Sequence, residues 1–493
     1  MLSPTKLQIS MTPTYRFLLF TTALGASVMM SCNLPQHATV QPSDAVPASF
    51  NNSSTDSSSM AVVSMTTFYK DSLLRTLIEE VLTNNTDINI AIQNIEMSRA
   101  FFRSSRTAFA PTLSGLGSAS ATTYGKYTME GVGNQETNAT PGLSKDQMVG
   151  THPTPNYWLG LSSTWELDFW GKLRFQKKAA RSRLLASQQG KNWMVSQLVA
   201  QTARLYYELI TLDNESIIID ENIKLQEHAL RIVESQKESG RATELAVQQF
   251  NAQMLNTETA KYKIRQQIRI LENQLNQLRG KYTGEVKRSK LMKFNLHFED
   301  YTEAGIPTDM LTRRMDVQQA FAALKASQAD ALAARAALFP SVSLSGYLAF
   351  NAFNGNLLFT AASLGNQLLG GVTAPLFQQR QLRTQYLVRT AEQKAAFYHY
   401  QKVAINAYQE VANHLFGIDS YKKLIALKKE EVIALDKGVG ISEDLYLTGY
   451  ATYLEIVAAQ KSKLEAQLEL LNFQMNRIHN HIDLYKSLGG GWQ

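Results

Sequence analysis

The sequence is poor in cysteine, in long apolar runs and in charge of one sign. Its 493 residues include one cysteine, so no disulfide can form within the chain and a multi-cysteine zinc site is excluded. Beyond the first 32 residues no segment reaches the roughly 18 consecutive apolar residues of a transmembrane helix. The net charge is +7 without a dominant basic run, which argues against a nucleic-acid partner.

The single cysteine, Cys32, ends a segment typical of a signal peptide. A charged start precedes the apolar run "FLLFTTALGASVMMSC", which is too short to span a membrane as a helix. The segment resembles a bacterial lipobox, in which the cysteine is acylated after cleavage before it. Ser31 fits that pattern, whereas Met29 stands where leucine is usual. We predict a signal peptide at 1–31 and a lipidated Cys32, with a plain secretory signal as the alternative.

The segment after Cys32 is rich in Pro, Ser and Asn, a composition typical of a flexible tether. We therefore assign residues 32–67 to the lipidated cysteine and an N-terminal linker. Because Met11 also precedes the apolar run, the sequence leaves open whether translation starts at Met1 or Met11.

Proline is absent, and glycine nearly absent, from about Gly171 to Glu238. This predicts one helix of roughly 68 residues, ~100 Å long at 1.5 Å per residue. It ends at "SGRATEL", where Gly240 suits a helix C-terminus. A second helix follows with apolar residues at 4-3-4-3 spacing, the seam of helices that pack along their length. The seam consists of Ile264, Ile268, Leu271, Leu275 and Leu278.

The second half repeats this arrangement. Helical sequence runs from about Arg380 to Asp436, breaks at "LTGYATYLEIV", and resumes with a second seam. The segments "SGRATEL" and "TGYATYL", around Gly240 and Gly449, match at an offset of 209, and so do "KLRFQ" and "QLRTQ". Two separate matches at one offset predict an internal duplication.

Both halves also begin alike. In "SSRTAFAPTLSGLGS" and "AARAALFPSVSLSGY" an Ala-rich helix ends before Pro111 or Pro340, because proline disfavours helix in the preceding residue. Extended, Ser/Gly-rich sequence follows. Each half therefore reads helix, strand, strand, long helix, turn, long helix. We assign the first repeat to residues 68–295 and the second to residues 296–490.

Four segments alternate as β-strands do, most clearly "YWLGLSSTWELDF", whose apolar and polar residues take opposite faces at period two. The apolar face would hold Tyr157, Leu159, Leu161, Trp165, Leu167 and Phe169, and the polar face Gly160, Ser162, Thr164, Glu166 and Asp168. Strands of about 10–13 residues suit a membrane-crossing barrel. Because four strands cannot close a barrel and open edges are not tolerated in lipid, the chain must pair with copies of itself.

These segments together resemble the TolC family of outer-membrane efflux proteins, in its lipoprotein branch, over about residues 68–490. The resemblance rests on "WELDFWGKLR", "APLFQQRQLR", "RRMDVQQAFAALKASQADALAARAALFPSVSLSG" and the two glycine-led turns. The family usually has proline where Met315 stands and glycine where Gln379 stands. The resemblance implies a mixed α/β membrane protein: a trimeric twelve-stranded outer-membrane β-barrel continuous with a long periplasmic α-helical barrel, with two internal repeats per chain.

The function implied by the resemblance is that of the outer-membrane channel of a tripartite efflux pump. The homotrimer would be a passive exit duct for substrates delivered by a periplasmic adaptor and an inner-membrane pump of the RND type. It would be lipid-anchored in the outer membrane and extend into the periplasm, with no cofactor besides the lipid on Cys32. A type I secretion duct of the same fold is one alternative. A non-conducting coiled-coil trimer is another, although it would need no alternating strands.

The resemblance also points to residues at the far end of the tunnel. Glu455 matches a position where acids line the aperture, and three copies would attract cations; the alternative is a solvated helix residue. Tyr446 matches a tyrosine that in some members ties the closed tip together; the alternative is ordinary helix packing. The hairpin tips, which would contact the adaptor, include Gly240, Arg241, Gly449 and Tyr450.

The segment "STWELDFWGKLR" would join barrel and tunnel. Glu166 and Asp168, two apart on one strand face, would sit roughly 6–7 Å apart, within reach of glycosidase spacing, but no sequence builds a pocket around them. We therefore expect no enzyme: the apolar face meets lipid and the two acids face the wet interior. The predicted joint comprises Trp165, Glu166, Asp168, Trp170, Gly171, Pro111 and Pro340.

No metal site is expected either. The eight histidines are scattered, and His479 and His481, two residues apart, point to different sides of a helix. No glycine-rich phosphate-binding loop occurs.

Overall fold

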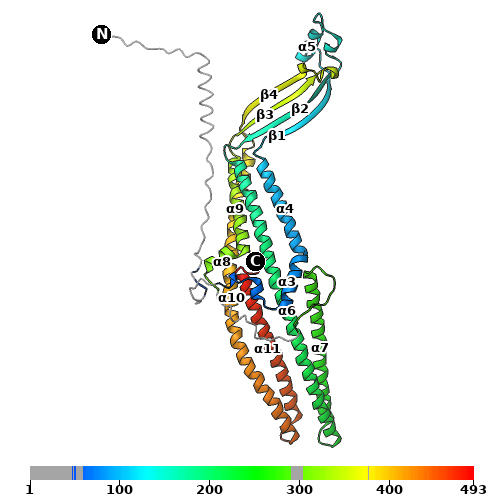
Figure 1. The fold of residues 1–493 in the computed structure, drawn as a ribbon, viewed down its shortest axis with the longest axis vertical. Coiled ribbons are helices and arrows are strands. Elements are labelled where there is room, and N and C mark those ends of the chain that lie inside the picture. The colour runs from blue at the N-terminus through cyan, green and yellow to red at the C-terminus, as the bar shows by residue number, and fades with distance from the viewer. Residues whose placement is uncertain (1–46, 48, 51–58, 290–303, 376, 493) are drawn as a thin grey trace, which may run out of the picture. The chain divides into compact units, whose positions relative to one another are not determined.

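A computed structural model describes residues 47, 49–50, 59–289, 304–375 and 377–492 (Figure 1). The predicted signal peptide, Cys32 and the predicted boundary at residues 295 and 296 lie outside these residues. Among the helices of the described ranges, none is long and apolar enough to cross a membrane.

Helices and four strands alternate along the chain in a similar order in both halves. The first half consists of α2 (Met65–Phe68), α3 (Ser72–Asn84), α4 (Thr86–Thr107), β1 (Thr112–Thr122), α5 (Met129–Asn138), β2 (Thr154–Leu167), α6 (Lys172–Glu238) and α7 (Glu244–Leu278). The second half consists of α8 (Pro307–Arg313), α9 (Met315–Ala336), β3 (Ser341–Ala352), β4 (Leu364–Thr373), α10 (Gln379–Leu447) and α11 (Tyr453–Ser487).

The two long helices follow the sequence pattern with one difference. The observed α6 matches the predicted helix closely, but α10 continues to Leu447, well beyond the end expected near Asp436. The extra segment includes Gly438 and Gly440, which cost helix stability. Val439 between them is buried, so packing of the helix outweighs that cost.

The predicted linker ends earlier than residue 67. Ser59 forms a β-bridge with Ala304, and Met60 lies in the apolar core. The Phe68 ring stacks on Tyr485 with 4.1 Å between ring centroids. The apolar residues near the end of this segment therefore pack against the C-terminal part of α11.

The four strands form one antiparallel sheet in the order β1-β2-β3-β4. The register confirms the alternation predicted for β2 up to Leu167. The apolar face carries Leu113, Leu159, Leu161, Trp165, Leu344, Leu348, Phe350, Leu364, Leu368 and Val372. The opposite, mainly polar face carries Ser114, Ser118, Ser162, Thr164, Glu166, Ser343, Ser345 and Gln367, together with Leu116, Trp158, Tyr347 and Leu369. Only β2 and β3 have a partner strand on both sides, so β1 and β4 are the edges.

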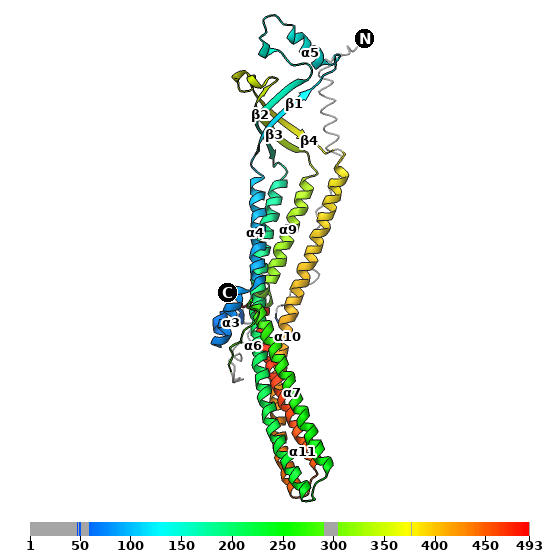
Figure 2. The same ribbon diagram turned by 90° about the vertical axis from the view of Figure 1, so that its right-hand side faces the viewer.

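The long helices form a layer in which α6 is central. Close to the sheet α6 packs between α4 and α9, and further along it packs between α7 and α11 (Figures 1 and 2). Helix α10 packs against α9 and then α11. The two hairpins, α6–α7 and α10–α11, turn at the end of the layer away from the sheet (Figure 2).

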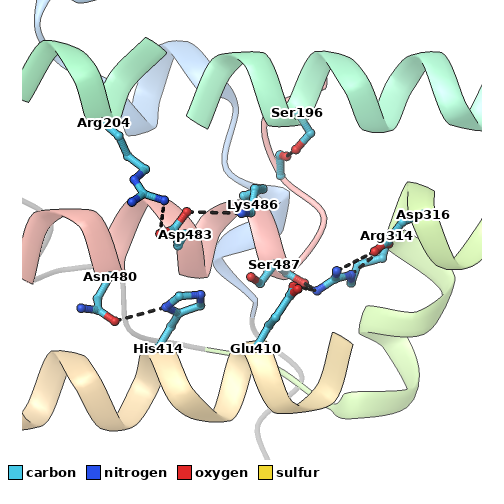
Figure 3. A network of polar contacts seen from close by, with 11 residues as sticks. Ser196, Arg204, Arg314, Asp316, Glu410, His414, Asn480, Asp483, Lys486 and Ser487 are labelled. Atoms are coloured by element: carbon cyan, nitrogen blue, oxygen red, sulfur yellow. Dashed lines mark hydrogen bonds and ion pairs between the residues drawn. The ribbon is translucent and has the colours of Figure 1, made fainter. Parts of the chain in front are cut away.

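A buried arginine ties the layer together at the level of the chain's C-terminal end (Figure 3). The Arg314 side chain is 1% exposed. Its guanidinium donates to Asp316 at 2.6 Å, to Glu410 at 2.8 Å and to the carbonyl of Ser487 at 3.1 Å. Burial alone would lower the pKa of Arg314, but hydrogen bonds and charge from Asp316 and Glu410 outweigh it and raise the pKa. The cation therefore joins α9, α10 and α11.

Candidate functional sites at the joint and the hairpin tips

Two tryptophans connect the sheet to the ends of the helices through hydrogen bonds from their indole N–H groups. The indole N–H of Trp165 donates to the carbonyl of Phe109 at 2.9 Å. The indole N–H of Trp170 donates to the carbonyl of Pro340 at 2.7 Å, and its ring stacks on Phe339 at 4.7 Å. The strands β1 and β3 begin at the residue after Pro111 and Pro340, in agreement with the helix breaks predicted there.

The two acids of the joint do not share a strand face, and this corrects the sequence prediction for Asp168. Strand β2 ends at Leu167, and Gly171 turns the chain with a φ of 82°. The Asp168 carboxylate accepts hydrogen bonds from the backbone N–H groups of Leu173 at 2.9 Å and Arg174 at 3.0 Å. Asp168 therefore caps the N-terminus of α6, where negative charge is favourable.

Glu166 does lie on the polar face, but its carboxylate is engaged by the Lys172 ammonium at 2.9 Å. The Arg174 guanidinium likewise approaches Asp168 at 3.1 Å. Each acid thus has its own cation, and Asp168 also accepts from the backbone of α6. The arrangement is that of a strand–helix junction.

The two hairpin turns have nearly the same backbone geometry. Gly240 and Gly449 have φ values of 74° and 81°, the left-handed region that favours glycine. The next residues, Arg241 and Tyr450, each donate a backbone hydrogen bond of 2.8 Å to a carbonyl at the end of the preceding helix. Both of these side chains are exposed, so the two turns share a backbone conformation but expose a guanidinium in one case and a phenol in the other.

The two turns are closed by different side chains. In the first hairpin Lys237 forms an ion pair with Glu244. In the second, the Thr452 hydroxyl donates to the Glu455 carboxylate in the first turn of α11. This hydrogen bond is the main reason that the pKa of Glu455 lies below its ordinary value. Glu455 is exposed at the tip, as a gate residue requires, and also stabilises the start of its own helix.

Near the tips, an apolar cluster joins the hairpins. Tyr446 packs against it, and partial burial raises the pKa of its phenol. The Phe250 ring lies 6.5 Å from that of Tyr453, across from one hairpin to the other. This tip cluster consists of Ala229, Val233, Ala246, Val247, Phe250 and Ile456, with Tyr446, Tyr453 and Val457 at its margin.

The structure separates the predicted residues into two groups. Those of the joint meet at the sheet ends of α4, α6 and α9, and those of the tips meet at the other end of the helical layer. Among the described residues, no group of three or more His, Cys, Asp or Glu side chains is arranged to hold a metal ion. His479 Nε2 lies 3.3 Å from the carbonyl of Arg204, and His481 is buried in α11.

Sequence reasoning missed the role of Arg314. The segment "RRMDV" served only as a marker of resemblance, and the partners Glu410 and Ser487 lie far along the chain. The available signal was an arginine two residues before an aspartate at the start of a helix.

A two-faced antiparallel sheet continued by helices of 67 and 69 residues defines the class of outer-membrane channel proteins with a helical extension. The chain belongs to the family described as outer membrane efflux protein, whose sequence profile matches residues 77–281 and 306–490. The resemblance inferred from the sequence is thereby confirmed.

Individual relatives cover most of the chain. The cation efflux system protein CusC of Escherichia coli O6:H1 is 27% identical over 427 residues, 87% of this chain and 88% of that protein. The pyoverdine export outer membrane protein OpmQ of Pseudomonas aeruginosa is 28% identical over 441 residues, 85% of each. A crystal structure of CusC superposes with a TM-score of 0.80 at 25% identity, covering 93% of this chain and all of that one.

The protein is therefore an outer-membrane efflux protein, and it serves as an exit duct of an efflux system. The family consists of channels and not of enzymes, which agrees with the structural roles of Glu166 and Asp168 at the joint.

Proposed function

We propose that three copies of this chain assemble into an outer-membrane duct. The observation that carries the proposal is the open sheet. Both edge strands, β1 and β4, carry exposed apolar residues, among them Leu113, Leu368 and Val372. Edge strands leave backbone N–H and C=O groups unpaired, which lipid does not tolerate. Edge-to-edge pairing between copies would satisfy these groups and close the sheet into a barrel.

The helices at the margins of the layer support the same assembly. Helix α10 exposes apolar side chains along its length, and so does α7 on its outer side. A row of exposed apolar side chains is removed from water when a partner helix packs against it. The exposed rows are Leu387, Ile405, Phe416, Leu427, Ile433 and Ile441 on α10 and Leu255, Tyr262 and Ile270 on α7.

In this assembly the apolar sheet face would meet lipid and the polar face would line the passage. The helices would continue the passage into the periplasm, with Glu455 and Tyr446 near the aperture. Transport would be passive, with energy supplied by an inner-membrane pump through a periplasmic adaptor that contacts the tips. The lipid on Cys32 would hold the N-terminus at the membrane.

The relatives support efflux over type I secretion as the setting. CusC is named for cations and OpmQ for pyoverdine, so different cargoes leave through chains of this kind. What they share is the exit duct; the trimeric assembly of that duct is what we propose for this chain.

Two measurements on the purified protein test the proposal. Native mass spectrometry should show three copies, and planar bilayers should show single-channel conductance. A trimer that never conducts, even after its tips are opened by substitution, would identify a structural coiled-coil protein instead. For the anchor, Cys32→Ser should abolish labelling by radioactive palmitate while leaving the trimer intact, and persistent labelling would contradict the lipobox.

A further inference from the structure

The ends of α4 and α6 next to the sheet carry a group of exposed cations that the duct itself does not explain. We infer that this group binds the anionic headgroups of phospholipids in the membrane leaflet on the helical side of the sheet. The inference rests on the proposed contact between the apolar sheet face and lipid. The basic collar consists of Arg103, Arg106, Lys177, Lys178 and Arg181.

On α6 the cations occupy one side of the helix. At 100° per residue, Lys177, Lys178 and Arg181 fall within about 100° of the helix circumference. All three are exposed, whereas the positions that flank this sector on both sides are buried. The buried flanking residues are Leu173 and Ala180 on one side and Ala179 and Ser182 on the other. The cations therefore project from one surface of the helical layer and not into its packing.

That surface is continuous with the apolar face of the sheet. Trp165 belongs to the apolar face, and its indole N–H donates to the carbonyl of Phe109. The Lys177 ammonium lies over the ring of the same Phe109, 5.4 Å from its centroid. The chain of contacts Trp165–Phe109–Lys177 places the cationic side of α6 directly beyond the apolar face.

The cations of α4 lie on the same side of the layer. On the opposite side, Phe101 of α4 and Arg183 of α6 line one hollow, and Arg183 pairs with Asp330 of α9 there. At 100° per residue, Arg106 and Arg103 are about 140° and 200° around α4 from Phe101. They therefore face away from that hollow, as the cations of α6 do.

The nearby carboxylates do not neutralise the collar. Asp168 is engaged by Arg174 and the backbone of α6, and Glu96 pairs with Arg99. Within the described part of the chain, Arg103, Arg106, Lys178 and Arg181 form no ion pair. Unpaired cations beside a lipid-facing surface are the complement of phosphodiester headgroups.

The reach of the side chains fits a headgroup layer. Arg181 lies within about 15 Å of the start of α6 at 1.5 Å per residue. The polar layer on each side of a bilayer is roughly 5–8 Å thick, and long cationic side chains extend back toward it along apolar surface. An acidic protein segment would not require the cations to adjoin the apolar face.

The test compares binding of phosphatidylglycerol and phosphatidylcholine to the full chain in neutral detergent, counted by native mass spectrometry. We expect the native protein to prefer phosphatidylglycerol and Lys178→Gln with Arg181→Gln to weaken its binding about fivefold per cation removed. The matched control is Lys224→Gln with Arg231→Gln, which removes the same charge from exposed positions roughly 70 Å along the same helix.

A collar variant that binds phosphatidylglycerol as tightly as the native protein overturns the inference. If that variant keeps its lipid preference but loses binding to an adaptor, the collar serves an acidic protein instead. Should the variant fail to form the native assembly, the salt dependence of the native protein decides: a preference unaffected by raised salt contradicts a headgroup site. Insertion into neutral vesicles without any lipid preference rejects only this inference, whereas failure to insert rejects the proposed duct as well.

Discussion

At the scale of single residues, Asp168 has a role that can be separated from its charge. Its carboxylate accepts two backbone hydrogen bonds at the N-terminus of α6. We predict that Asp168→Ala lowers stability by about 1 kcal/mol, the usual cost of losing a side chain that accepts hydrogen bonds at a helix N-terminus. The midpoint of thermal unfolding in detergent measures this. Asp168→Asn can still cap and should cost less; equal losses for both variants would show that the Arg174 ion pair matters more than the cap.

Glu455 combines a charge at the tip with a contact to Thr452. We predict that Glu455→Gln weakens the cation preference of single channels and raises their conductance, because it removes the charge and keeps a hydrogen-bonding side chain. Within one chain the Thr452 bond lowers the pKa of Glu455, whereas repulsion among three copies would raise it, so a preference that is lost above the ordinary glutamate range as pH falls would show that the three carboxylates lie close together. Glu465→Gln, further along α11, is the control. Unchanged selectivity in Glu455→Gln would remove this residue from the gate.

Residue roles differ in how far the sequence could predict them. Pro111 and Pro340 break helices through their own backbone, so local sequence was sufficient. Asp168 continued the alternation of β2, and only the left-handed turn at Gly171 shows that the strand has already ended. Glu455 was found through the family pattern, but its bond to Thr452 depends on side-chain geometry.

At the scale of elements, glycine has opposite effects in the turn and in the helix of one hairpin. Gly449 has a φ of 81°, whereas Gly438 lies inside α10 with open space around it. We predict that Gly449→Ala destabilises by about 1 kcal/mol or more, and that Gly438→Ala stabilises by roughly 0.5–1 kcal/mol. Thermal unfolding of the two variants side by side tests this. Shifts of the same sign would contradict the assigned backbone conformations.

The elements themselves were largely predictable because the helices are long and periodic. The seam of α7 and the extent of α6 follow from spacing and from the lack of proline. The end of α10 could not be predicted from the sequence, because burial of Val439 outweighs the local effect of the neighbouring glycines. The packing of residues 59–68 against α11 could not be predicted either, since it joins opposite ends of the sequence.

At the scale of the whole molecule, Arg314 links segments that the sequence keeps far apart. Glu410 lies 96 residues away and Ser487 173 residues away. Removing the buried cation leaves Glu410 and the Ser487 carbonyl without this donor and leaves Asp316 with only the backbone N–H of Val317. We predict that Arg314→Met lowers stability by about 2 kcal/mol or more and loosens the C-terminal end of α11.

Arg314→Lys is the matched control, because it keeps the charge but loses the forked geometry, and it should fall between the native protein and Arg314→Met. Thermal unfolding and amide hydrogen exchange in α11 measure both effects. Native-like exchange in Arg314→Met would show that the apolar core alone holds the C-terminal end.

The two hairpin turns read "GRAT" and "GYAT", and they differ at the second position alone, Arg241 against Tyr450. Around the rim of the proposed trimer, six turns of one shape would alternate between a guanidinium and a phenol. The rim would thus present two kinds of contact site to a binding partner, in a fixed order around the threefold axis. A single substitution of Arg241 or Tyr450 would change that order without changing the backbone of the turn.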